Sequence, residues 1–130
     1  MRATRILISA VLFSVASYGI ALAAEAMPTE IKMNNGMLTD AKGMTLYTWD
    51  NDQKGVSTCY DKCATAWPPL LVPAGTAVTG DFTLVDRKDS DQKIVAYKGM
   101  PLYTWFKDTK PGDTTGDGVG KTWHTAVESM

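Results

Sequence analysis

Short runs of β-branched and aromatic residues, separated by turn residues, recur along the chain from residue 31 onward. Such runs fit a pleated, half-buried surface and predict β-strands. Asn35-Gly36, a type I′ turn signal, lies between Ile31–Met33 and Met37–Thr39 and predicts a β-hairpin. A polar turn joins a second pair of runs, which predicts a second hairpin: Phe82–Val85 and Lys93–Ala96.

The chain also contains an internal duplication. Lys42–Asp52 recurs as Lys98–Asp108 with eight of eleven positions identical, and Trp67 recurs as Trp123 in the same register. Each copy is predicted to form an antiparallel three-stranded meander, with its third strand in the duplicated motif. We therefore predict a mostly β fold, in which the two repeats (about 31–74 and 81–127) form one compact sandwich or small barrel.

The copies diverge after the shared strand. The first continues with Cys59–Ala66, which predicts one short helix, because Thr58 and Asp61 resemble a capping box and Pro68 disfavours helical geometry before it. The second copy has the segment Gly112–Gly120 instead, which is too rich in glycine for a helix.

The N-terminal residues resemble a targeting signal. Arg2 and Arg5 precede an apolar stretch that ends in Ala-Leu-Ala at Ala23, which predicts a secretory signal peptide over residues 1–23. Polar residues interrupt this stretch, so a membrane anchor is disfavoured. We expect a single domain over residues 24–130, with no membrane span or lipid anchor after cleavage and a periplasmic or secreted location.

The net charge and the absence of known catalytic motifs argue against two classes of function, nucleic-acid binding and enzymatic activity. The 130 residues include 13 Lys and Arg against 14 Asp and Glu, for a formal net charge of −1. This balance offers no basic face of the kind that nucleic-acid binding needs. No nucleophile motif, phosphate-binding loop or metalloprotease helix is present. We expect neither an enzyme nor a cofactor.

The two cysteines, Cys59 and Cys63, leave three interpretations open. An exported location favours a structural disulfide. The alternatives are a redox pair or a metal pair, although the spacing is not that of a thioredoxin-like site and no histidine follows as haem attachment requires.

Two further segments suggest metal chemistry. Soft ligands suit Cu(I), so Met44, Met100 and His124 are the alternative candidates for a copper site, although core filling explains the two equivalent methionines more simply. The segment from Asp113 to Asp117 imitates the start of a calcium loop, but it lacks the bidentate glutamate. We predict a mobile structural loop there.

Aspartates and tryptophans also repeat at equivalent places. Asp52 and Asp108 each follow an aromatic strand, where aspartate accepts turn amides or a tyrosine hydroxyl more often than it serves in a catalytic pair. The four tryptophans are expected to build the core between the copies: Trp49, Trp67, Trp105 and Trp123. An exposed pair would instead form a platform for a sugar, peptide or envelope polymer.

The duplicated motif reads Tyr47-x-Trp49-x-x-Asp52 in the first copy and Tyr103-x-Trp105-x-x-Asp108 in the second. It resembles the Tyr-x-(Phe/Trp/Tyr)-x-x-Asp motif of a bacterial secreted-repeat family whose members are often called lipoproteins, and the segment from Cys59 to Pro69 is similar as well. The resemblance implies an exported β-rich repeat domain without an agreed biochemical function. This chain departs from the lipoproteins because it lacks an acylated cysteine.

From these observations we expect a non-enzymatic domain that binds an unknown partner or envelope component. The alternative is a periplasmic copper-binding or redox protein that uses Met, Cys and His ligands.

Overall fold

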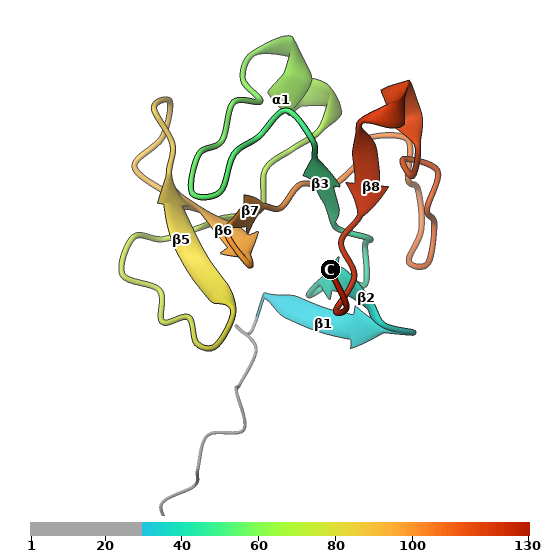
Figure 1. Cartoon of the computed structure of the whole chain (residues 1–130), viewed down its shortest axis with the longest axis horizontal. Helices are drawn as coiled ribbons and strands as arrows, with labels where there is room; N and C mark the ends of the chain where they lie inside the picture. Colours follow the sequence, from blue (N-terminus) through green and yellow to red (C-terminus); the bar gives the residue numbers. More distant parts are fainter. Residues whose placement is uncertain (1–29) are drawn as a thin grey trace, which may run out of the picture.

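The computed structural model describes residues 30–130, so the predicted signal peptide lies outside the described residues. Within them the chain is mostly β with one short helix and several antiparallel sheets, and it forms no closed barrel (Figure 1). The predicted β-rich fold is thus confirmed. The elements, in chain order, are β1 (Ile31–Asn34), β2 (Met37–Asp40), β3 (Tyr47–Trp49), α1 (Lys62–Ala66), β4 (Leu71–Val72), β5 (Phe82–Asp86), β6 (Lys93–Tyr97), β7 (Met100–Pro101), the 3-10 turn η1 (Val119–Lys121) and β8 (Trp123–Thr125).

Both predicted hairpins are present. β1 and β2 pair antiparallel around the two-residue turn Asn35-Gly36, whose φ angles of 50° and 78° are the left-handed values of a type I′ turn. β5 and β6 pair antiparallel from Phe82↔Tyr97 to Asp86↔Lys93.

A third segment follows each hairpin and completes the meander. In the second copy, β7 folds back on β6 through the turn Lys98-Gly99. In the first copy, the equivalent segment pairs with β2 through a bridge between Thr39 and Thr45 and a bond from the Leu46 N–H to the Leu38 carbonyl (3.0 Å).

The last segment of each copy then crosses to the other copy. β4, from the first copy, pairs with β6 of the second. β8, from the second copy, pairs with β3 of the first, and the two strands lie side by side in Figure 1. Val127, just after β8, bridges to Met37 on β2. The two copies therefore share their sheets, an exchange that the sequence did not predict.

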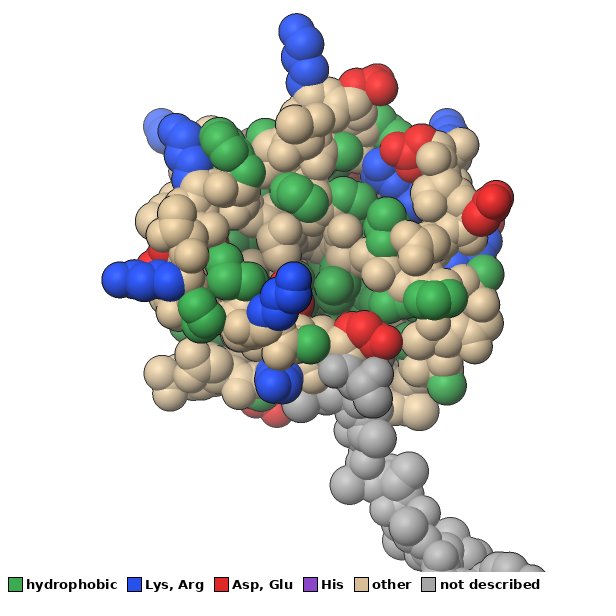
Figure 2. Space-filling model, turned by 180° about the vertical axis from the view of Figure 1, so that it is seen from behind, with side chains coloured by type: hydrophobic (Ala, Val, Ile, Leu, Met, Phe, Trp, Pro, Cys, Tyr) green, Lys and Arg blue, Asp and Glu red, His purple; other side chains and the backbone are tan. Residues whose placement is uncertain are grey.

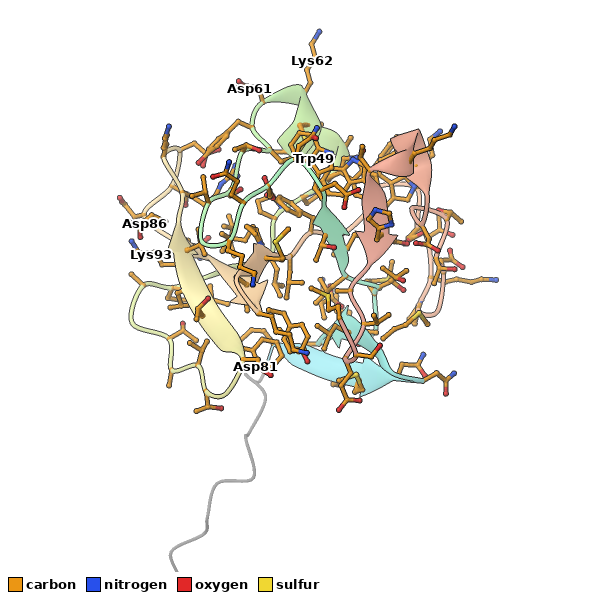
Figure 3. All side chains as sticks on the ribbon, viewed as in Figure 1. Trp49, Asp61, Lys62, Asp81, Asp86 and Lys93 are labelled. Atoms are coloured by element: carbon orange, nitrogen blue, oxygen red, sulfur yellow. A yellow bond between two sulfur atoms is a disulfide. The ribbon has the colours of Figure 1, made fainter. Side chains whose placement is uncertain are left out.

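The helix begins later than the sequence suggested. α1 starts at Lys62, after Asp61, whose φ is positive (53°), and no side chain among the described residues caps it. The predicted capping box is wrong because the Thr58 hydroxyl donates to Asp52 Oδ1 (2.8 Å) instead. Figure 3 shows Asp61 and Lys62 pointing away from the body of the protein at this end of the helix. None of the helices within residues 30–130 is long and apolar enough to cross a membrane.

The buried apolar residues form two clusters, and both contain residues from each copy. The first joins the hairpins: Ile31, Leu38, Leu46, Val72, Phe82, Val95, Tyr97, Leu102 and Ala126. The second surrounds the inner tryptophans: Tyr47, Cys59, Trp67, Val85, Ile94, Ala96, Tyr103 and Trp123. Since the duplicated motif lies in the second cluster, that cluster is where the candidate site is found.

Candidate functional site

Two tyrosine–aspartate pairs connect the copies at the centre of the fold. The Tyr47 hydroxyl donates to Asp108 Oδ2 and the Tyr103 hydroxyl donates to Asp52 Oδ2, each at 2.6 Å. The main chains of the two tyrosines also exchange hydrogen bonds, with N···O distances of 2.7 and 3.0 Å. Each copy of the motif therefore supplies the tyrosine for the other copy's aspartate.

Each aspartate is held by a threonine as well. Asp52 Oδ1 accepts from the backbone N–H (2.7 Å) and the hydroxyl (2.8 Å) of Thr58. Asp108 Oδ1 accepts from the same two groups of Thr115. Each carboxylate therefore accepts three hydrogen bonds, one from a tyrosine and two from a threonine. Sequence reasoning missed both threonines, although each is a hydroxyl residue shortly after a motif aspartate.

Both tyrosine hydroxyls are shielded from water. Burial raises the pKa of Tyr47 and of Tyr103 far above the usual value, and the hydrogen bonds to Asp108 and Asp52 raise it further. The bond from Gly116 to Tyr47 and the bond between Ser57 and Tyr103 oppose this effect without cancelling it. Both side chains are therefore neutral phenols at physiological pH.

The four tryptophans form a continuous column. The ring centroids of Trp49 and Trp123 are 5.1 Å apart, those of Trp123 and Trp67 are 3.7 Å apart, and those of Trp67 and Trp105 are 3.9 Å apart. The equivalent residues Trp67 and Trp123 are buried in the middle, and Trp49 and Trp105 are half-buried at the ends. Tyr47 packs edge-on against Trp67, and Tyr103 packs in the same way against Trp123.

The two ends of the column differ. Trp49 Nε1 donates to the Thr122 hydroxyl (3.3 Å), whereas the buried Trp105 Nε1 has no hydrogen-bond partner among residues 30–130. The Thr122 carbonyl accepts from the Asp50 N–H, and the Ala66 carbonyl accepts from the Phe106 N–H in the equivalent place. Ala66 therefore takes the position of Thr122 at the Trp105 end, and it has no hydroxyl to accept the indole N–H.

An exposed aromatic side chain lies at the Trp105 end. The Phe106 ring is 57% exposed and contacts the Trp105 ring edge-on, with centroids 4.8 Å apart. The Lys107 ammonium lies 5.7 Å from the Phe106 ring centroid. The sequence analysis did not identify Phe106 as a candidate residue. The feature that could have identified it is that Phe106 occupies the position of Asp50 in the first copy.

Cys59 and Cys63 form a disulfide with a Cα–Cα distance of 5.2 Å. Arg87 on the neighbouring hairpin fixes this loop, because its guanidinium donates to the Cys59 carbonyl (2.6 Å) and to Ser57 Oγ (2.9 Å). Ser57 in turn shares a hydrogen bond with the Tyr103 hydroxyl (2.6 Å). Arg87 thus connects the disulfide loop to the central tyrosine, a role that nothing in its local sequence indicates.

The three alternative copper ligands lie on or next to different strands. Met44 follows β2, Met100 is on β7, and His124 is on β8, where Nε2 lies 2.9 Å from Asp50 Oδ2. No group of three or more His, Cys, Asp or Glu side chains in residues 30–130 is placed to hold a metal ion.

The side chains of the calcium-like segment have separate partners. Asp113 Oδ2 accepts from the N–H groups of Thr109 and Lys110, which lowers the pKa of Asp113. Asp117 Oδ1 accepts from the Thr125 N–H (3.2 Å), and the Thr115 hydroxyl donates to Asp108. These bonds attach the loop at several points, so we expect it to be more ordered than its glycines alone suggest.

These features define a β-rich domain in which two copies of one motif interlock around an aromatic column. The chain belongs to the family described as a secreted repeat of unknown function, whose sequence model matches residues 30–71 and 83–127. The resemblance drawn from the duplicated motif is therefore confirmed, and the description of the family supports an exported location. Neither the curated proteins nor the solved structures gave a match.

Proposed function

We propose that this chain is a non-enzymatic periplasmic or secreted domain that binds an envelope component through the Phe106 end of the tryptophan column. The observation that supports this proposal is the exposed Phe106 ring, held in place on Trp105. Exposed aromatic side chains with a rigid support are typical of binding surfaces, because they offer a large apolar area at a small entropic cost.

The support beneath Phe106 is well defined. The Phe106 N–H donates to the Ala66 carbonyl (3.0 Å) and the Thr104 N–H donates to the Pro68 carbonyl (2.9 Å), so the backbone is fixed on both sides of Trp105. Lys107 adds a positive charge beside the ring. This combination suits a partner with a sugar ring or apolar face and a nearby negative charge.

Burial of the aspartates supports a non-enzymatic role. Asp52 and Asp108 are 5% and 8% exposed, and their oxygens accept from tyrosine and threonine donors. A catalytic carboxylate must instead reach a substrate in a cleft. Figure 2 shows charges of both signs around small apolar areas on the rear face, without one dominant sign of charge.

Co-sedimentation of residues 24–130 with purified cell-wall sacculi, and separately with vesicles of envelope membrane, tests the proposal. Phe106→Ser should reduce the bound fraction without changing the melting temperature. Val56→Ser is the matched control, because Val56 is also exposed (47%) but belongs to another part of the chain. No binding by the wild type to either preparation, or equal binding by the two variants, would contradict the proposed surface.

A further inference from the structure

The aromatic column has the features of a one-electron relay. Tryptophan and tyrosine are among the most easily oxidised side chains, and electron tunnelling weakens steeply as the separation between donor and acceptor grows. Neighbouring rings in the column are in or near contact, with centroid separations of 3.7–5.1 Å. The outer rings, Trp49 and Trp105, are half-buried, so a diffusible oxidant can approach them.

Each inner tryptophan also contacts a tyrosine that has a proton acceptor. Tyr47 packs against Trp67 and donates to Asp108, and Tyr103 packs against Trp123 and donates to Asp52. A neutral phenol is oxidised far more easily when its proton leaves at the same time. The 2.6 Å hydrogen bond to a carboxylate provides that path at each tyrosine.

Cysteine does not compete with the tyrosines as an electron donor in this cluster. Cys59 lies in the same buried cluster, but its sulfur is already oxidised in the disulfide with Cys63. A free thiol there would otherwise compete with the tyrosines as the final electron donor.

We propose that the column carries one-electron oxidation from the surface to Tyr47 and Tyr103. A diffusible one-electron oxidant takes an electron from an outer tryptophan. The inner tryptophan beside it then reduces the resulting radical cation by transferring an electron to it. The inner tryptophan then takes an electron from its tyrosine, while the phenolic proton moves to the aspartate. The products are the reduced oxidant, a neutral tyrosyl radical and a protonated Asp108 or Asp52, so electrons and protons balance.

This relay is independent of the proposed binding surface. The oxidant meets the half-buried outer tryptophans, the later steps take place among buried side chains, and none of the steps requires Phe106. A protein that fails to bind envelope material could still carry the oxidation inward, and the converse also holds.

Laser flash photolysis with a ruthenium tris-bipyridine sensitiser and an electron-accepting quencher tests the relay in the folded protein. The measured quantity is the yield of tyrosyl radical by transient absorption, minus the yield from Tyr47→Phe/Tyr103→Phe. The wild type should show a clear excess, and Trp67→Phe/Trp123→Phe should abolish it, because phenylalanine preserves aromatic packing but is much harder to oxidise. Tyr97→Phe is the matched control: Tyr97 is buried but packs on Phe82 outside the column, so the excess should remain.

An absent excess in the wild type would overturn the proposal, as would an undiminished excess in the folded Trp67→Phe/Trp123→Phe variant. If that variant does not fold, the decisive comparison uses the Tyr103→Phe background, where Tyr47 is the remaining central tyrosine. Adding Trp67→Phe should then abolish the radical signal that Tyr47 contributes. Persistence of that signal would equally refute the relay.

Discussion

Alkaline pH should destabilise this protein through its two central tyrosines. Burial and the hydrogen bonds to Asp108 and Asp52 raise the pKa of Tyr47 and Tyr103 in the folded state far above the value of about 10 that tyrosine has in an unfolded chain. Above that pH the unfolded chain releases two protons that the folded protein retains. The stabilisation is fully present below pH ~10 and is lost as the pH rises toward the folded-state pKa values.

The size of the effect follows from the number of protons. One proton released on unfolding changes the free energy of unfolding by about 1.36 kcal/mol per pH unit, so two tyrosines give about 2.7 kcal/mol per pH unit above pH ~10. Domains are commonly stable by about 5–15 kcal/mol. Two pH units above this point would therefore remove a large part of the total stability.

Urea unfolding followed by tryptophan fluorescence, at pH values from about 9 to 11.5, measures this slope of stability against pH. Tyr47→Phe/Tyr103→Phe should flatten the slope, although it also lowers stability at neutral pH by removing the two hydrogen bonds. Tyr97→Phe is the matched control for the loss of a buried tyrosine hydroxyl, since the Tyr97 hydroxyl donates to the Glu128 carbonyl rather than to a carboxylate. The same slope in the wild type and the central double variant would refute the reasoning.

Three further predictions concern packing, the exchange of segments and the glycine-rich loop. Gly116→Ala should cost about 1–3 kcal/mol of unfolding free energy in urea titrations, because a Cβ there would lie 2.9 Å from both the Trp67 and Tyr47 rings; wild-type stability would contradict this. Residues 24–80 alone should show no cooperative thermal unfolding in circular dichroism, because β4 pairs with the other copy; a sharp transition would mean that the copies fold separately. Millimolar Ca²⁺ should barely change the melting temperature in scanning calorimetry, because the loop carboxylates accept internal donors; a rise of several degrees that Mg²⁺ does not reproduce and Asp117→Asn abolishes would contradict this.

The local elements could be predicted from the sequence because their signals are local. Asn35-Gly36 fixes its hairpin through two left-handed residues, and a polar turn between two runs of strand-forming residues marks the other. The duplication also identified which residues are equivalent. The duplication could not show whether a strand pairs within its own copy or with the other copy. Equivalent strands have similar sequences, so either pairing partner is equally compatible with them.

The candidate site was harder to predict because its partners are distant in the chain. Tyr47 and Asp108 are 61 residues apart in the sequence and meet only in the tertiary fold. An ungapped alignment places Thr58 opposite Thr114, yet Thr115 makes the equivalent bonds in the structure. Arg87 contacts the disulfide loop through tertiary packing, which no spacing rule describes.

The differences between the copies lie at the ends of the column rather than at its centre. At the centre, each tryptophan, tyrosine and aspartate has its equivalent, so the duplicated core explains their arrangement. At one end, Asp50 pairs with His124 and the Trp49 N–H has a partner. At the other end, Phe106 replaces the aspartate, and the Trp105 N–H has no partner within the described part of the chain. One end of the column therefore carries paired polar groups and the other an exposed aromatic ring beside Lys107, which is why we place the proposed binding surface at the Phe106 end.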